Sequence, residues 1–244
     1  MQPKSIREVV GWAAGVMLSP LVVVGTWLRD ARLAHPSGVV CAADVVPLVK
    51  EEGEGPLSAF ATRFTGGAIV RFSGSFWRRV DAPEPLGCAI RFRGPRPLVA
   101  DASPGDQDLI TATTSLYHRD YLRRPYYALG SFDADRLHNV AVRLMPVEVD
   151  LHPGSSRRER LLNAIDTGQA TLRLEVRPRR ERDAAWQPLC ELHLRGLLLL
   201  DQEKLGFSPW RTGLGLVPRG ALQAARAILY PAGLAARRLA SASS

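Results

Sequence analysis

An arginine and a tyrosine lie four residues apart near the carboxyl end of the chain, in Arg226-Ala-Ile-Leu-Tyr230. Helical spacing would place both side chains on one face, one turn apart. A neighbouring guanidinium favours the ionised form of a phenol, and a phenolate is a hard anionic ligand for ferric iron. A pair at this spacing also occurs as an ordinary surface contact. The motif by itself leaves both interpretations open.

A histidine near the other end of the chain is a candidate for acid–base chemistry, in Arg32-Leu-Ala-His35-Pro-Ser-Gly38. The chain has five histidines, and none forms an HxxxH or HExxH pair. No Walker loop, nucleophile elbow or dinucleotide-binding glycine motif is present. His193, in a strand-like run, is interpreted as structural, and His152, beside Pro153, as a loop residue. No single motif therefore assigns a reaction.

Composition predicts a folded domain rather than a disordered chain. Of the 244 residues, 46% are hydrophobic and 23% are charged, with a formal net charge of +8. A basic balance fits nucleic acid, an anionic membrane surface or a buried anionic ligand. The arginines are scattered, with short clusters at 157–158 and 177–180 and no basic stripe interleaved with aromatic residues. Nucleic acid is therefore not an expected partner.

The cysteines predict a reducing compartment. Cys41, Cys88 and Cys190 are odd in number, far apart and without CxxC spacing, and each lies in an apolar, strand-like run. We expect buried, inert thiols rather than a disulfide framework or a zinc site. A cytoplasmic location follows from this interpretation.

The amino-terminal segment is apolar. Val9–Leu28 contains no charged residue and has about the length needed to cross a bilayer, while basic residues precede and follow it. Pro20 and three glycines would kink or break a spanning helix. No short apolar core with a small-x-small cleavage site supports a signal peptide. Residues 1–30 are therefore predicted to form an apolar helix, either packed on the protein or associated with a membrane.

After residue 30 the pattern changes to short apolar runs with period two, bounded by Gly, Pro, Asp and Ser. This pattern predicts strands at Gly38–Leu48, Ala68–Ser73, Cys88–Phe92, Leu109–Leu116, Val140–Val147, Ala170–Val176 and Leu189–Leu199. Helices are expected at Arg157–Thr167 and Gly220–Ala240, the latter with arginines in its last turn. Many strands at this spacing favour an antiparallel barrel or a sandwich.

The order of several segments resembles the haem catalase family, especially its short catalase-related peroxidases. The resemblance covers most of the chain after residue 30. It rests on segments at Arg32–Gly38, Ile69–Ser73, Asp81–Phe92, Asp108–Thr114, Leu205–Pro209 with Val217-Pro218, and Leu222–Pro231, with Arg237 seven residues past the tyrosine. The resemblance implies an α+β fold for residues 31–244, with a closed antiparallel β-barrel, flanking helices and a carboxyl-terminal helix that carries the tyrosine.

The resemblance also implies haem b as the cofactor. Tyr230 would be the proximal ligand of the haem iron, with Arg226 keeping the phenol ionised. Three arginines would pair with the haem propionates, namely Arg32, Arg71 and Arg237. On the distal side, His35 would be the catalytic acid and base, and Ser73 would hydrogen-bond to it and fix its orientation.

Two departures from the family pattern bear on activity. The position of the family's distal asparagine falls on Ala112 or Thr113, and the chain is far shorter than a full catalase. These departures favour a peroxidase with weak or no catalase activity, acting on hydrogen peroxide or organic hydroperoxides with an organic electron donor. Alternatives are an enzyme that rearranges or oxygenates a lipid-like substrate, and a non-catalytic, membrane-associated haem-binding barrel. The resemblance further implies a homo-oligomer, and Val9–Leu28 leaves membrane contact open.

Overall fold

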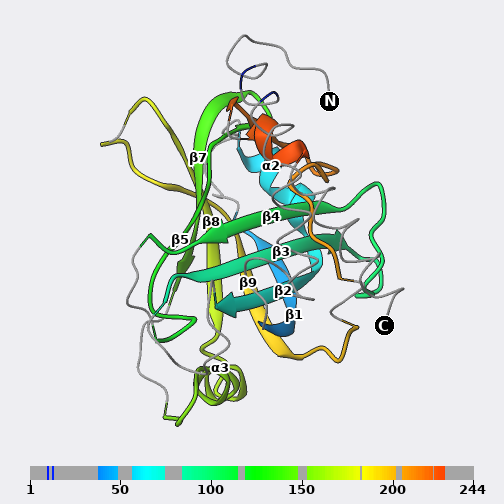
Figure 1. The fold of residues 1–244 in the computed structure, drawn as a ribbon, viewed down its shortest axis with the longest axis vertical. Coiled ribbons are helices and arrows are strands. Elements are labelled where there is room, and N and C mark those ends of the chain that lie inside the picture. Colours follow the sequence, from blue (N-terminus) through cyan, green and yellow to red (C-terminus); the bar gives the residue numbers. More distant parts are fainter. Residues whose placement is uncertain are drawn as a thin grey trace.

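The computed structural model describes residues 38–48, 57–74, 84–114, 119–147, 153–181, 183–201, 205–221 and 223–228, together with residues 10 and 13. Strands dominate these residues (Figure 1). In chain order the elements are β1 (Gly38–Pro47), α2 (Ser58–Ala61), the 3-10 helix η1 (Thr62–Phe64), β2 (Gly66–Gly74), β3 (Leu86–Gly94), β4 (Gln107–Ala112), β5 (Tyr126–Ala128), β6 (Ser131–Ala134), β7 (Leu137–Pro146), α3 (Arg157–Asp166), β8 (Thr171–Pro178), β9 (Gln187–Leu197) and β10 (Leu216–Arg219).

Eight of the described strands close into one antiparallel barrel. Their hydrogen-bonded order is β7-β5-β4-β3-β2-β1-β9-β8, and the pairing of β7 with β8 completes the ring. Strands β6 and β10 extend the sheet beyond β7, outside the ring. In Figure 1, β2, β3 and β4 run across the direction of β7 and β8. The predicted closed antiparallel barrel is therefore confirmed, and the sandwich alternative is wrong.

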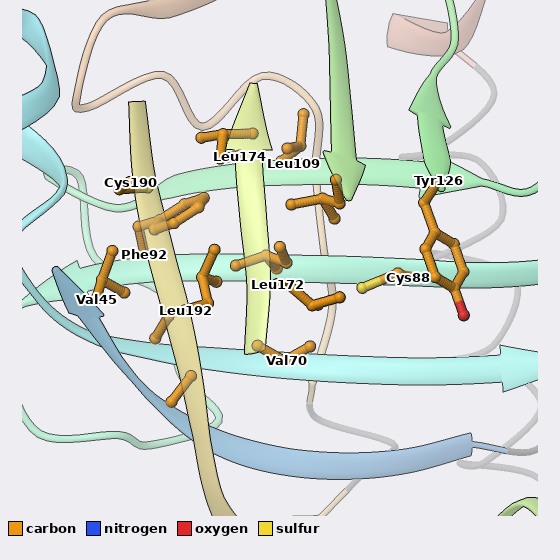
Figure 2. Packing of buried hydrophobic residues seen from close by; sticks show 14 of the residues in the cluster. Val45, Val70, Cys88, Phe92, Leu109, Tyr126, Leu172, Leu174, Cys190 and Leu192 are labelled. Atoms are coloured by element: carbon orange, nitrogen blue, oxygen red, sulfur yellow. The ribbon is translucent and has the colours of Figure 1, made fainter. Parts of the chain in front are cut away.

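The barrel interior is filled by alternate residues of its strands. Val70, Phe92 and Leu109, from β2, β3 and β4, are buried together with Leu172 and Leu192, from β8 and β9. Figure 2 shows these side chains meeting across the interior. Because successive side chains of a strand point to opposite faces, the intervening residues lie on the outer face. Two predicted site residues, Arg71 and Ser73 of β2, lie on this outer face.

The three cysteines are free and buried, as predicted. Burial raises the pKa of Cys41 to about 12, and it also raises the pKa of Cys88 and of Cys190. The reactive thiolate form appears only as pH rises toward the pKa, so at pH 8 the buried Cys41 thiol stays in its unreactive, protonated form. We expect iodoacetamide to leave native protein unlabelled at pH 8 and to label all three cysteines in guanidinium chloride, as measured by mass spectrometry. Rapid labelling of native protein would contradict this burial.

Every predicted strand corresponds to an observed strand, although the boundaries differ. The strand predicted at Leu109–Leu116 ends as β4 at Ala112, and residues 115–118 lie outside the described residues. Sequence reasoning missed β5, β6 and β10, which have three or four residues each. These strands are too short to show a period-two pattern, and β10 contains a proline. Their positions depend on pairing with β4, β6 and β7.

The helix predicted at Arg157–Thr167 is confirmed as α3. Its amino end has a capping arrangement, because the Ser156 side chain accepts a hydrogen bond from the backbone N–H of Glu159. The Glu159 carboxylate in turn accepts one from the backbone N–H of Ser155 at 2.7 Å. Such reciprocal bonds satisfy backbone donors that have no partner within a helix. The capping chemistry explains why α3 begins where the sequence indicated.

The predicted terminal helices are described only in part. Residues 221 and 223–228 are helical, and the remainder of Gly220–Ala240 lies outside the described residues. Of residues 1–30 only 10 and 13 are described, both helical, so the expectation for Val9–Leu28 and the domain boundary at residue 30 stay predictions. Within the part of the chain that the structure describes, no helix has the length and apolarity to cross a bilayer.

Candidate functional site on the outer face of the barrel

The structure describes three of the predicted site residues. Arg71 and Ser73 lie two residues apart on β2, with their side chains on the same face of the strand. Arg226 lies in the helical segment 223–228. The other predicted site residues, Arg32, His35, Tyr230 and Arg237, lie outside the described residues.

Strand register aligns Ser73 and Arg71 with small residues of neighbouring strands. Directly paired residues of antiparallel strands have their side chains on the same face. One row across β1 to β4 consists of Gly38, Ser73, Gly87 and Ala112, and the next consists of Val40, Arg71, Ala89 and Ile110. We call these two rows the outer platform. Apart from Arg71, Val40 and Ile110, the platform carries only hydrogen, methyl or hydroxymethyl side chains, so a flat ligand could approach the backbone closely.

Arg71 and Ser73 are both buried, each with 3% of its surface exposed. A Cβ atom built on Gly38 would lie 2.8 Å from the Arg71 Cζ atom and 2.5 Å from the Phe72 carbonyl oxygen. Only glycine at position 38 therefore admits the guanidinium where it lies. A buried guanidinium stays charged and is suited to forked pairing with a carboxylate. The platform thus combines a small-residue surface, a hydroxyl group and a buried cation.

The platform also separates Ala112 from Thr113, the two positions at which the resemblance would place an asparagine. Ala112 ends β4 and lies across Gly87 from Ser73 in the same row. Thr113 is buried and engaged locally, because its Oγ1 accepts a hydrogen bond from the Leu86 N–H at 2.9 Å and its own N–H donates to the Leu86 carbonyl at 2.8 Å. Of these two residues, Ala112 therefore lies on the platform, and its methyl group can neither donate nor accept a hydrogen bond.

A third row of the outer face is covered by the segment that follows β9. Arg91 of β3 and Asp108 of β4 form a fully buried ion pair, with 3.0 Å between Nε and Oδ1. The other carboxylate oxygen accepts hydrogen bonds from Arg211 Nη1 at 2.6 Å and from the Ser208 N–H at 2.8 Å. The Arg91 guanidinium also lies over the Phe207 ring, 5.2 Å from its centroid.

This ion-pair cluster attaches residues 205–211 to the barrel directly before β10 and the helical segment 223–228. Sequence reasoning quoted Asp108 and Leu205–Pro209 only as points of resemblance and did not predict the cluster. Alternating charged and apolar residues in Ala89-Ile-Arg-Phe-Arg93 were an available signal, because a charge in a barrel strand requires a partner on its face.

Arg226 is held beside the turn between β5 and β6. Its side chain is buried, and its Nη1 donates a hydrogen bond to Gln223 Oε1 at 3.4 Å. Gln223 is fully buried and donates from Nε2 to the Leu129 carbonyl. A Cβ atom on Gly130, whose φ is +92°, would lie 3.0 Å from Gln223 Nε2. Gln223, which sequence reasoning did not single out as a site residue, therefore anchors the helical segment that carries Arg226.

A second buried ion pair closes the end of β2 beyond Ser73. Glu84 pairs with Arg157, the first residue of α3, at 3.0 Å between Oε1 and Nη1, and both side chains are buried. Tyr121 lies beside Phe72, with 5.1 Å between ring centroids. Burial raises the pKa of Tyr121, against the opposing effect of Arg157. This polar cluster therefore ties α3 to the strand that carries Arg71 and Ser73.

The described residues contain no group of three or more His, Cys, Asp or Glu side chains placed to hold a metal ion. The polar groups that the described residues bring to the platform are one guanidinium and one hydroxyl. Such a site suits a flat ligand that carries its own acidic groups. A haem with propionates fits the chemistry of these groups, because a guanidinium such as that of Arg71 can pair with a carboxylate.

Solved structures of two catalases share this fold. A fungal catalase matches with a TM-score of 0.57 at 14% sequence identity, over 85% of this chain and 59% of the catalase chain. A bacterial catalase matches with a TM-score of 0.53 at 11% identity, over 85% of this chain and 57% of the catalase chain. The chain therefore has the catalase-like barrel fold, and it spans less than two thirds of the length of either catalase. No protein-family model and no curated protein matches the sequence.

Proposed function

We propose that this chain is a haem b-dependent oxidoreductase that reacts with peroxides in the manner of a peroxidase. The observation that carries the proposal is the outer platform, where buried Arg71 and Ser73 border a row of small residues on a catalase-like barrel. The sequence motifs around Tyr230 and His35 would supply the remaining groups, a phenol to hold the iron and an imidazole for proton transfer. When bound, the haem supplies the redox chemistry that cleaves a peroxide O–O bond.

The chain's own residues would divide the remaining tasks. Tyr230 would hold the iron through its phenolate oxygen, with the Arg226 cation favouring the ionised phenol. Arg71 would pair with a propionate from β2, and Arg32 and Arg237 would do so from segments outside the described residues. We expect the positive charge of the buried Arg71 guanidinium to be neutralised by a propionate carboxylate of the haem.

On the distal side, His35 would accept a proton from one peroxide oxygen and return it to the other. An imidazole ionises near neutral pH, so it can serve in both directions. Ser73 would hydrogen-bond to the imidazole and hold its orientation. Hydrogen peroxide or an organic hydroperoxide would be the oxidant, and an organic donor would supply two electrons.

The alanine at position 112 favours peroxidase over catalase chemistry. Ala112 lies on the platform one strand from Gly87 and two strands from Ser73, where its methyl group cannot donate a hydrogen bond. A second peroxide molecule would then lack one of the groups that could position it. An organic donor, or an apolar hydroperoxide, would meet a methyl surface instead.

Titration of the purified chain with hemin tests the proposal. We expect a Soret band that saturates at one hemin per chain. Arg71→Gln should weaken hemin binding by about tenfold or more, because one charge-assisted hydrogen-bonding partner is lost. Arg195→Gln is the matched control, since Arg195 lies on β9 in an exposed pair with Asp44. A chain that stays colourless with hemin, or equal effects of the two substitutions, would contradict the proposal.

Products of the peroxide reaction then separate the functions. A peroxidase consumes hydrogen peroxide in proportion to a phenolic donor and releases little oxygen. Oxygen release without a donor would indicate a catalase. Loss of a lipid hydroperoxide with no donor oxidised would favour a rearranging enzyme, and hemin binding with no peroxide loss would favour the non-catalytic barrel.

A further inference from the structure

A pocket of about 440 Å³ opens between the loop that joins β3 to β4 and the loop that precedes β10. Residues 102–104 line it from the first loop, and residues 210–213 line it from the second. A volume of this size is typical of sites for small organic molecules. The guanidinium of Arg211 is the one charged group among the lining residues.

Backbone contacts hold the two loops of the pocket together. The Gly213 N–H donates to the Asp106 carbonyl at 3.0 Å, and the Asp108 N–H donates to the Arg211 carbonyl at 2.9 Å. A Cβ atom built on Gly213 would lie 2.4 Å from the carbonyl carbon of Gly105, so only glycine permits this close approach. The pocket walls are therefore fixed relative to each other.

The ion-pair cluster to which Arg211 belongs carries an excess of positive charge. Its members are linked by salt bridges, and we call them the Arg91 cluster: Arg91, Arg93, Arg96, Arg211, Asp106 and Asp108. Four guanidiniums and two carboxylates give the cluster a formal net charge of +2. Asp101, a further carboxylate in the β3–β4 loop, is exposed. Solvent screens its charge, so it does little to balance the cluster.

Burial makes this excess charge costly. Arg91 and Arg93 are 0% and 4% exposed, and both aspartates are fully buried. Arg93 Nη1 donates to the Val99 and Asp101 carbonyl oxygens, which carry no net charge. Arg93 Nε is buried and has no hydrogen-bond partner among the described residues. Buried cations without matching anions destabilise a protein, so an additional anion near the cluster would be favourable.

The pocket is where such an anion can approach the cluster. Arg211 uses Nη1 for the Asp108 carboxylate and the Gly206 carbonyl, at 2.6 Å each, and its side chain is 28% exposed. Its Nε and Nη2 form no hydrogen bond with the residues that the structure describes. Arg96 lies nearby, because a Cβ atom built on Gly105 would lie 3.4 Å from Arg96 Nη1. An anion in the pocket would therefore meet Arg211 directly, with Arg96 close behind Gly105.

We propose that this pocket binds a small organic dianion, either a phosphate monoester or a dicarboxylate. A ligand charge of −2 would balance the Arg91 cluster, and a guanidinium is suited to both kinds of acidic group. The organic part would lie against Pro104 and Trp210, which line the pocket. The proposal goes beyond the haem site and uses none of the platform residues.

Isothermal titration calorimetry of the full chain tests the proposal. The probes are phenyl phosphate and phthalate, which are both dianions, and benzamide, which is neutral. We expect at least one dianion to bind about tenfold or more tightly than benzamide, because charge-assisted hydrogen bonds are lost in the neutral probe. Added sodium chloride should weaken this binding. The dianion that binds more tightly identifies the acidic group of the ligand class.

Two results of this titration would overturn the proposal. One is no binding of either dianion at millimolar concentration, and the other is binding of benzamide as tight as that of the dianions. The titration needs no hemin, so its outcome is distinct from that of the hemin experiment.

Ala102 offers variants that leave the Arg91 cluster intact, because it lines the pocket from an exposed position. Ala102→Glu should weaken dianion binding by about tenfold, since like charges repel. Ala102→Gln has nearly the same size without the charge and should stay within about threefold of wild type. Ala185→Glu controls for net charge, at an exposed position in the loop between β8 and β9. Equal loss in Ala102→Glu and either control would overturn the proposal.

Arg211→Gln tests the lining cation itself. Dianion binding should fall by about tenfold or more, because the charged donor in the pocket is lost. Thermal unfolding shows whether this variant is folded, since Arg211 also contacts Asp108. Arg195→Gln, in an exposed pair, should bind the dianion as wild type does. Wild-type affinity in folded Arg211→Gln protein would contradict the proposed site.

Discussion

Replacing Asp108 with alanine is expected to lower the free energy of unfolding by about 3–5 kcal/mol, because a buried guanidinium is left without its carboxylate. Asp108 accepts hydrogen bonds from Arg91, Arg211 and the Ser208 N–H. The side chains of Asp108 and Arg91 are both fully buried. The carboxylate of Asp106 lies 4.0 Å from Arg91 Nε, too far to replace the hydrogen bonds that Asp108 accepts from Arg91 and Arg211. Urea unfolding followed by circular dichroism measures the difference.

The exposed pair of Asp44 and Arg195 is the matched control for this substitution. Its atoms are 2.7 Å apart, yet both side chains are more than half exposed. Solvent screens such a pair, so Asp44→Ala should change the free energy of unfolding by less than about 1 kcal/mol. Asp108→Asn, which keeps the side-chain volume and one acceptor, should fall between the two. Equal small effects at positions 108 and 44 would show that water reaches the Arg91 cluster.

Tyr230→Phe is expected to have the largest effect on the proposed function, because it removes only the oxygen that would hold the iron. Loss of a residue that merely supports a metal ligand costs 10- to 100-fold in affinity, so loss of the ligand itself should weaken hemin binding by more than about 100-fold. Any remaining complex should lack the phenolate charge-transfer absorption of the wild type. Visible spectra during hemin titration measure both quantities.

Tyr126→Phe serves as the control for this substitution. Tyr126 lies on β5 with its ring inside the barrel, on the face opposite the platform, where its hydroxyl donates to the Tyr121 carbonyl at 2.7 Å. Loss of its hydroxyl should leave the hemin spectrum and affinity unchanged. If Tyr230→Phe kept the wild-type spectrum, the proximal assignment would be wrong, even if the barrel bound hemin.

Part of the fold could be predicted because local chemistry is enough to define it. Alternation of apolar and polar residues marked β1 and β7, and the helix predicted at Arg157–Thr167 coincides with α3, whose start is capped by Ser156 and Glu159. The order of short strands favoured an antiparallel barrel or a sandwich. The sequence could not distinguish them, because strands of both architectures show the same alternation of apolar and polar residues. Only the β7–β8 pairing, between segments separated by α3, distinguishes a closed ring from two sheets.

The candidate site could be predicted in its residue types but not in its arrangement. Arg71 and Ser73 were recognised from a resemblance, and their burial beside Gly38, Gly87 and Ala112 follows from register across four strands. A shift of one residue would turn every one of these side chains into the core. Register is set by packing over the whole barrel, so no local segment of sequence contains it.

The sequence by itself determined the residue types, the strand-forming segments, the three buried cysteines and the excess of arginine. The tertiary structure alone decided which arginines find carboxylates, such as Arg91 with Asp108, and which have no carboxylate partner among the described residues, such as Arg119 and Arg158. The physical reason is that pairing requires two side chains within about 4 Å. In a barrel that distance depends on register and closure between segments far apart in the chain.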